Sequence, residues 1–317
     1  MVRKVLIVDK ADPVLTELLE GAGFSCSTIL NITAQQYIDL PDEYIGLVIR
    51  SKFSVDQHVI ASKPGLKFIA RLGAGMEHID TTFASQQEIV CISTPEGNAP
   101  AVAQHALALL LNNLRHITEA NQEVREGLWL REKNKGREIG SLTIGIIGFG
   151  NTGKAFVDVL SPFNPKILVY DKYKNDIIYN NVQEISLEYL LEQSDVISIH
   201  INYIRDNHFF FNKNIFEKMR KGTLLINTSR GAVLNTFDLL NAIDEGIIAH
   251  ACLDVLEYEN VNLQIPPKAE WDQTLMHLTE NVNVTLTPHI AGQTPESEKR
   301  HALIAFRKII ETMNVRR

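Results

Sequence analysis

The chain has few cysteines and no long apolar run, and both absences narrow what it can be. Of its 317 residues only three are cysteine, namely Cys26, Cys91 and Cys252. Three widely spaced cysteines in mostly apolar surroundings do not form a disulfide framework or a paired CxxC site. No stretch approaches the roughly eighteen apolar residues of a membrane-spanning helix, and the first apolar run is too short for a signal peptide. We therefore expect buried, reduced thiols in a soluble cytoplasmic protein.

An excess of basic residues is missing as well. The formal net charge is −7 and no dense block of Lys and Arg occurs, which argues against a nucleic-acid partner. The chain lacks an HExxH motif and a close cluster of His and Asp, so we expect no metal site. Ser229 lacks the GxSxG context of a hydrolase nucleophile. What remains is an ordinary globular composition, long enough for two domains.

The most informative stretch is residues 141–171. A β-branched apolar run leads into Gly148, Gly150 and Gly153, a helical pattern follows, and a second apolar run ends at Asp171. A strand, a GxGxxG turn, a helix and a strand in one unit are typical of dinucleotide-binding folds. Gly148 would permit the tight turn, Gly150 the approach of a pyrophosphate, and Gly153 close packing of the helix on the sheet.

The acidic residue at the end of this unit indicates which dinucleotide binds. Asp171 could accept hydrogen bonds from an adenosine ribose and would repel a 2′-phosphate. Lys172 and Lys174 weaken that preference only slightly. The helix N-terminus after Gly150 would face the phosphates with its N–H groups. The sequence therefore predicts NAD as the cofactor; the alternative, a purely structural glycine turn, leaves the acidic residue unexplained.

Apolar strand patterns alternate with helical patterns along the whole chain. The expected strands are residues 5–8, 44–50, 66–71, 142–147, 196–201, 223–228, 249–255 and 282–287. This alternation implies parallel sheets covered by helices on both faces, with a crossover helix over 99–120. We expect an α/β protein of two doubly wound domains. A Rossmann-type NAD domain, residues 99–289, would be inserted in a flavodoxin-like domain of residues 1–98 and 290–317.

Four polar residues follow strands of the second expected domain: Arg230, Asp254, Glu259 and His289. Because parallel strands end at the same edge of a sheet, these side chains should converge on one crevice. Plainer interpretations exist for each. Arg230 could form a surface ion pair and Asp254 could cap a turn. Glu259 could be a solvated residue, and His289 a simple loop donor.

Three of these residues match the needs of hydride transfer to a carbonyl. The carbonyl oxygen needs a proton donor, for which an imidazole such as His289 is suited. A carboxylate hydrogen-bonded to that imidazole, here Glu259, would orient it and favour its protonated form. The guanidinium of Arg230 could bind a substrate carboxylate through two hydrogen bonds.

The first domain has a candidate site of its own. The strand that ends at Arg71 runs into a second glycine turn, which contains Ala74 and Gly75. Ligands bind at this edge of open α/β sheets. Arg50, at the end of the preceding strand, would point into the same crevice. A tight turn and a surface cation are the alternatives.

The motifs GFGNTG, INTSRG, LDVLEYE and TPHIAGQT, in this order, resemble the D-isomer-specific 2-hydroxyacid dehydrogenases. The likeness covers nearly the whole chain. It implies an NAD-dependent interconversion of a D-2-hydroxy acid and a 2-keto acid, a substrate-binding first domain, and a homodimer formed through the NAD domain.

By this resemblance Arg230, Glu259 and His289 are the catalytic residues, and the amides of Ala74 and Gly75 bind the substrate carboxylate. The implied cofactor contacts, besides the glycines, are Asn151, Thr152, Asp171, Ile201, Thr228, Asp254 and His289.

Within the family, the segments VIRSK and GLWLREKNKGREI look most like 3-phosphoglycerate dehydrogenases, in a short form without a regulatory domain. Arg50 would then lie near the substrate phosphate. A glyoxylate or hydroxypyruvate reductase is the alternative enzyme. An NAD-sensing binding protein, similar to the corepressors that share this fold, is the alternative of another class.

Overall fold

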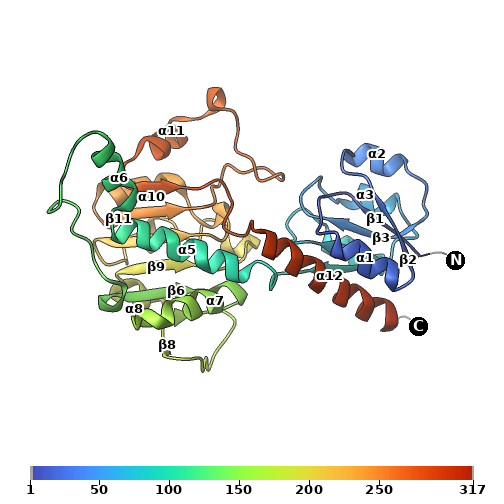
Figure 1. Cartoon of the computed structure of the whole chain (residues 1–317), viewed down its shortest axis with the longest axis horizontal. Coiled ribbons are helices and arrows are strands. Elements are labelled where there is room, and N and C mark those ends of the chain that lie inside the picture. Colours follow the sequence, from blue (N-terminus) through green and yellow to red (C-terminus); the bar gives the residue numbers. More distant parts are fainter. Residues whose placement is uncertain (1–2, 316–317) are drawn as a thin grey trace. The chain divides into compact units, whose positions relative to one another are not determined.

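The computed structural model describes residues 3–315, which divide into two compact units (Figure 1). The first unit contains the described residues up to Ala99, the segment Asn260–Gln264 and the residues from Gln293 onward. The second unit contains Pro100–Glu259 and Ile265–Gly292. Each unit has its own sheet and its own hydrophobic clusters.

A five-stranded parallel sheet with the order β2-β1-β3-β4-β5 forms the centre of the first unit. Its strands are β1 (Arg3–Ile7), β2 (Phe24–Thr28), β3 (Tyr44–Ile49), β4 (Phe68–Arg71) and β5 (Val90–Ser93). Its helices are α1 (Val14–Gly21), α2 (Ala34–Asp39), α3 (Gln57–Ala61), α4 (Thr81–Gln86) and α12 (Pro295–Val315). This strand order is the flavodoxin-like order.

Both faces of this sheet are covered, because its strands are apolar on both sides. Tyr37 of α2 and Val59 of α3 pack in one cluster with Leu47 of β3. Leu15 of α1 and Ile309 of α12 pack in the cluster on the opposite side. The carboxyl ends of the strands are left for the loops that carry the candidate residues.

The second unit has a seven-stranded sheet, ordered β12-β11-β10-β9-β6-β7-β8. Its strands are β6 (Thr143–Ile147), β7 (Lys166–Tyr170), β8 (Val182–Glu184), β9 (Val196–Ile199), β10 (Thr223–Asn227), β11 (Ile248–Leu253) and β12 (Val284–Leu286), and every pair is parallel. Its helices are α5 (Ala99–Leu114), α6 (Ile117–Arg125), α7 (Asn151–Leu160), α8 (Leu187–Gln193), α9 (Lys213–Phe216), α10 (Thr236–Asp244) and α11 (Gln273–Glu280).

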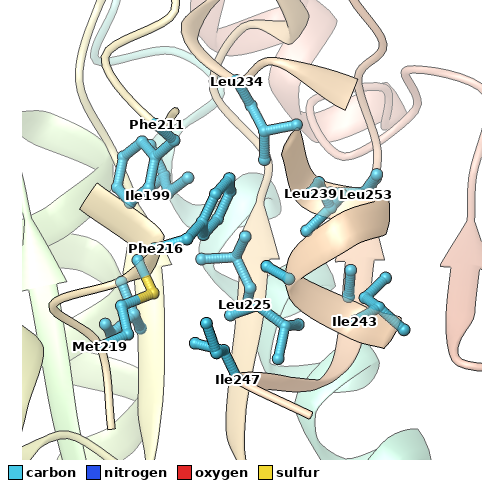
Figure 2. Close-up of a cluster of buried hydrophobic side chains, with 14 of the residues drawn as sticks. Ile199, Phe211, Phe216, Met219, Leu225, Leu234, Leu239, Ile243, Ile247 and Leu253 are labelled. Carbon is cyan, nitrogen blue, oxygen red and sulfur yellow. The ribbon is translucent and has the colours of Figure 1, made fainter. Parts of the chain in front are cut away.

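Successive residues of a strand point to opposite faces, and the two cores of this unit follow from that alternation. Ile146 of β6 packs in one cluster with residues of α5 and α7, whereas Ile147 packs in the other with residues of α8, α9 and α10. In the second cluster Phe211 and Phe216 lie beside Leu225 of β10, next to side chains of α10 (Figure 2). Both faces of the sheet are covered by apolar side chains, so polar functional groups lie at the carboxyl ends of the strands.

The predicted fold class, two doubly wound parallel sheets, is confirmed. The prediction of one helix over 99–120 is wrong in its length. The helix is interrupted at His116, whose φ of 52° is left-handed. Helix α5 ends at Leu114 and α6 begins at Ile117. Strands β2, β5 and β8 are absent from the sequence prediction; all three are short strands at the edges of their sheets.

The cysteines match the prediction in part. All three are free thiols, but only Cys252 is buried, whereas Cys26 and Cys91 are half-buried. Burial raises the pKa of the Cys252 thiol to about 12 and the pKa of the other two to about 11. Thiols with raised pKa values are poor nucleophiles. No helix within residues 3–315 is long and apolar enough to cross a membrane.

Candidate active site

The glycine turn after β6 has the geometry of a nucleotide-binding turn. Gly148 has a φ of 95°, and a Cβ there would lie 2.7 Å from the His200 carbonyl carbon. A Cβ on Gly153 would lie 2.2 Å from the Gly148 carbonyl oxygen, so α7 packs directly on the turn. By contrast, a Cβ on Gly150 would meet no atom within 4 Å. The space beside Gly150 is therefore open to a ligand.

Asp171 lies at the end of β7, where it is bonded to this turn. Its Oδ2 accepts a hydrogen bond from Phe149 N at 2.7 Å, and its Oδ1 accepts from Tyr173 N at 2.9 Å. The ammonium of Lys174 donates to the Phe149 carbonyl at 2.7 Å. The carboxylate thus also has a structural task, which the sequence does not indicate.

The residues around the turn fit a dinucleotide. Helix α7 starts at Asn151 and Thr152, and no side chain caps its first amides, which leaves them for an anion. Ile201 follows β9 and would be 2.9 Å from a Cβ on Gly148. Thr228 follows β10, and its buried Oγ1 has no hydrogen-bond partner within residues 3–315. A buried hydroxyl is normally satisfied, so a bound ligand is a natural partner for it.

His289 and Glu259 are joined directly. His289 Nδ1 lies 2.5 Å from Glu259 Oε2, and Glu259 Oε1 accepts from Leu256 N at 2.6 Å. The carboxylate is therefore held by the backbone of its own loop while it orients the ring. His289 itself has a left-handed φ of 54°, which is uncommon outside glycine. Such strain at a non-glycine residue is often found at functional sites.

Arg230 lies on the loop after β10, and Gly231 explains its position. A Cβ on Gly231 would lie 1.9 Å from the Leu256 carbonyl carbon, so the two loops touch backbone to backbone. Asn227 Nδ2 donates to the Arg230 carbonyl at 3.1 Å, and Arg230 Nη1 donates to the Ser229 carbonyl at 2.7 Å. The structure thereby brings the Arg230 loop onto the loop that contains Glu259.

Asp254 is buried beneath the His289 loop, with 1% of its side chain exposed. Its carboxylate accepts from Thr287 Oγ1 at 2.6 Å, from Ile290 N at 2.9 Å and from Ala291 N at 2.8 Å. The Asp254 carbonyl accepts from His289 N at 2.8 Å. This aspartate is therefore an anchor for the loop, beyond the cofactor contact that the sequence suggests.

The first-unit candidates lie at the carboxyl edge of the five-stranded sheet. Gly73 N donates to Thr94 Oγ1 at 2.9 Å, which fixes the turn that contains Ala74 and Gly75. Arg50 follows β3, and its Nη1 lies 3.3 Å from Glu298 Oε1. Arg71 was not predicted from the sequence as a site residue; its Nη1 would be 1.8 Å from a Cβ on Gly73. Its position at a strand end was the available signal.

His301 is a further buried polar residue of this edge. Its Nδ1 lies 2.7 Å from Thr94 Oγ1. Burial, together with the positive charges of Arg50 and Arg71, lowers the pKa of His301 to about 4. The imidazole is therefore neutral at physiological pH. Within residues 3–315 no group of three or more His, Cys, Asp or Glu side chains could hold a metal ion.

Comparison with known proteins identifies the family. The model described as D-isomer specific 2-hydroxyacid dehydrogenase, NAD binding domain, matches residues 107–291. The chain belongs to this family. Membership confirms the predicted class, an NAD-dependent 2-hydroxyacid dehydrogenase that acts on a CH–OH group, and it confirms NAD as the cofactor.

Relatives within this dehydrogenase family differ in their substrates. The hydroxypyruvate reductase of Thermotoga maritima is 31% identical, and the match covers 98% of this chain and 99% of that protein. The D-3-phosphoglycerate dehydrogenase of Archaeoglobus fulgidus is 32% identical, but its match covers 97% of this chain and only 56% of that protein. The chain therefore spans little more than half the length of this relative.

The dehydrogenase fold is shared along the whole chain. The crystal structure of a D-lactate dehydrogenase from Treponema pallidum is 26% identical, with a TM-score of 0.83, and the match covers 99% of this chain and 96% of that one. The comparisons identify the enzyme class and leave the choice of 2-hydroxy acid open.

Proposed function

We propose that His289 is the acid/base of this dehydrogenase and that its substrate pair is 3-phosphoglycerate and 3-phosphohydroxypyruvate. The hydrogen bond between His289 Nδ1 and Glu259 Oε2 carries the first part of the proposal. A ring that donates from Nδ1 to a carboxylate is fixed in orientation and tautomer, so Nε2 is the nitrogen that exchanges a proton. Bound NAD supplies the hydride acceptor or donor.

Three side chains would act on the substrate. In oxidation, His289 Nε2 takes the proton of the C2 hydroxyl, and in reduction it returns that proton to the carbonyl oxygen. Glu259 stabilises the positive ring that forms when His289 is protonated. Arg230 binds the substrate carboxylate and polarises the neighbouring carbonyl, as a guanidinium can through paired hydrogen bonds. The amides of Ala74 and Gly75 would bind the same carboxylate.

The choice of a phosphorylated substrate is supported by the charges of the first unit. Arg50 and Arg71 follow neighbouring strands, and Arg71 Nε lies 3.3 Å from the Arg50 carbonyl oxygen. Both therefore belong to one edge, where two guanidinium groups favour a dianion. The ion pair of Arg50 with Glu298 is partly exposed, with 28% and 30% of the two side chains accessible. Such a pair is weak enough for a phosphate to replace it.

A panel of 2-keto acids with NADH tests the function, with turnover followed as the loss of NADH absorbance. We expect 3-phosphohydroxypyruvate to give the highest kcat/KM and His289→Ala to lower kcat by about 10²–10⁴-fold. Wild-type-like turnover by His289→Ala would refute the acid/base assignment. Binding of NADH without turnover of any keto acid would favour the NAD-sensing alternative.

Arg50→Ala separates the two substrate hypotheses. We expect it to raise KM for 3-phosphohydroxypyruvate by about tenfold or more, since a charged hydrogen bond contributes about 1.5–3 kcal/mol. The KM for hydroxypyruvate should stay unchanged. Lys10→Ala is a matched control, since Lys10 also lies near Glu298, at 3.6 Å, but is 78% exposed. Equal effects of Arg50→Ala on both keto acids would contradict a phosphate role.

A hydroxypyruvate reductase is the second candidate. The hydroxypyruvate reductase of Thermotoga maritima supports this candidate, because the match with this chain covers 99% of that protein. The pairing of Arg50 with Glu298 also favours it, because that pair already neutralises one of the two guanidinium groups. A higher kcat/KM for hydroxypyruvate than for its 3-phosphate would establish this candidate.

We further propose that the protein is a homodimer through its NAD domain. Helix α6 and the loop after it expose apolar side chains, namely Ile117, Val124, Leu128, Trp129 and Leu130. Lys133 and Asn134 hold this loop against α6 through Glu123. A fixed segment with this many exposed apolar residues is characteristic of an association surface.

A further inference from the structure

A histidine of α5 joins the hydrogen bonds beneath the His289 loop. His105 Nε2 lies 3.0 Å from Thr287 Oγ1 and 3.6 Å from Asp254 Oδ1. No role for His105 was predicted from the sequence. Its side chain is 20% exposed, while that of Asp254 is 1% exposed, so the contact lies at the boundary of the core. Helix α5 is thereby connected to the strand end that precedes the proposed acid/base.

The direction of these hydrogen bonds follows from the hydrogens available. The Thr287 hydroxyl has one hydrogen and donates it to Asp254 Oδ1, at 2.6 Å. Its contact with His105 must then use an oxygen lone pair, so the imidazole donates from Nε2. His105 is consequently in the Nε2–H tautomer. The chain of donors runs from His105 to Thr287 and from Thr287 to Asp254.

The same carboxylate determines the conformation of the His289 loop. Asp254 Oδ1 accepts from Ile290 N and Oδ2 from Ala291 N, at 2.9 and 2.8 Å. These two amides directly follow the left-handed backbone of His289. A non-glycine residue in that conformation costs about 1–3 kcal/mol and persists only where surrounding contacts enforce it. The orientation of the Asp254 carboxylate therefore affects the position of the imidazole.

We infer that His105 is a positioning residue for His289. By donating to Thr287, it fixes the hydroxyl so that the hydroxyl hydrogen points at Asp254, and the carboxylate is then oriented toward the amides of residues 290 and 291. Without His105 the hydroxyl of Thr287 can rotate, and the loop loses part of its restraint. The inference rests on the proposed acid/base role of His289, but the hydrogen-bond chain can be tested without turnover.

The chain contains a matched control for this arrangement. His250 Nε2 lies 2.9 Å from Thr285 Oγ1, two residues before Thr287. The bond is of the same type, and Thr285 lies in β12, the strand that precedes Thr287, but among the described residues neither partner is hydrogen-bonded to Asp254. Substitutions in this pair should therefore affect general packing to a similar degree without affecting the His289 loop.

Amide hydrogen exchange of the cofactor-free protein tests the chain directly. We expect His105→Ala and Thr287→Val to lower the protection of the amides of 290 and 291 by about five- to tenfold, the loss of one net hydrogen bond. His250→Ala and Thr285→Val should leave it within about twofold. His105→Gln, which keeps an N–H donor, should restore most of the protection. Unchanged exchange at these two amides in His105→Ala would overturn the inference.

Kinetics with NADH and the fastest 2-keto acid of the panel provide the second readout. His105→Ala should lower kcat by about five- to tenfold, the loss of one net hydrogen bond, with KM for NADH unchanged. The isotope effect from NADH deuterated at the transferred position should rise, because hydride transfer becomes slower than product release. His250→Ala should change neither quantity.

A double substitution identifies the route. If His105 acts through Thr287, His105→Ala with Thr287→Val should lose no more activity than the more severe single variant. A double variant whose loss of activity equals the product of the two single losses would overturn the inference. If the wild type reduces none of the keto acids, the proposed function fails, whereas the exchange measurement still decides the role of His105.

Discussion

The Glu259 carboxylate shows how one side chain combines structure and chemistry. One oxygen accepts from Leu256 N, which orders its own loop, and the other contacts His289 Nδ1. With 13% of its side chain exposed, Glu259 is shielded from water, so its charge acts on the ring with little screening. Glu259 therefore connects the order of its own loop to the position of the His289 ring.

Removing that charge should slow turnover without unfolding the protein. Glu259→Gln keeps the shape and an acceptor oxygen but cannot stabilise a positive imidazole. We expect kcat to fall by about 10²–10⁴-fold, because the ring loses the carboxylate that fixes its tautomer and stabilises its charge. Steady-state kinetics with NADH and the best keto acid measure it, with the exposed Glu270→Gln as control. A kcat within twofold of wild type would contradict the proposed pairing.

At the scale of elements, the loops that follow β10 and β11 touch because glycine leaves room. Gly231 meets the backbone of Leu256, and no flexible side chain there can move away. Gly150 at the start of α7 contrasts with it, since the space that its missing side chain leaves is open. One glycine permits packing of the protein on itself, and the other permits approach of a ligand.

Alanine substitutions should separate these two uses. Gly231→Ala forces backbone apart, and we expect it to lower the free energy of unfolding by about 1–3 kcal/mol and to reduce kcat. Gly150→Ala should leave stability nearly unchanged but weaken NADH binding. Urea unfolding and NADH titration measure the two effects. Gly21→Ala, in open space on α1, is the control and should not destabilise the protein; equal stabilities of all three variants would contradict this account.

At the scale of the whole molecule, each unit contains a buried neutral histidine. Burial lowers the pKa of His200, in the second unit, to about 3. In the first unit, burial and nearby arginines lower the pKa of His301 to about 4. Both folded-state values lie below the ordinary 6.5. At a pH between the folded-state and the unfolded-state pKa of a histidine, the unfolded chain binds more protons than the folded one. Acid therefore lowers the free energy of unfolding of both units.

Stability should therefore fall as the pH is lowered from about 6.5 toward 4. The histidine contribution is complete above the unfolded pKa, and each histidine adds a slope of at most about 1.4 kcal/mol per pH unit below it. Urea unfolding at pH 7, 6 and 5 measures the slope. His200→Gln should reduce the slope for the second unit in part, because burial also lowers the pKa of His250 in that unit to about 4. A slope that is the same in His200→Gln and wild type would rule out this histidine as its source.

Assembly is the second property at this scale. Trp129 is 75% exposed on the loop after α6, and a ring this large is normally covered in a soluble protein. We expect Trp129→Asp to shift a dimer toward monomer in sedimentation velocity. Phe237→Asp, at a similarly exposed site on α10, should leave the assembly unchanged. A wild type that sediments as a monomer at micromolar concentration would disprove the homodimer.

The sequence by itself determined what depends on local pattern. Alternation of apolar strands and helices predicted both parallel sheets, and the spacing of the glycines and Asp171 predicted a dinucleotide-binding turn, because these features follow from backbone requirements of neighbouring residues. Residues at strand ends, such as Arg230 and His289, were predictable because parallel strands end at one edge.

Only the tertiary structure decided which side chains touch. His105 and Thr287 are 182 positions apart, and no local pattern reveals that they share a hydrogen bond. The polar edge strand β2 depends in the same way on its pairing with β1, which lies about twenty positions earlier in the sequence. Hydrogen bonds between separate elements form only after the sheet has fixed their distances, so they are properties of the fold.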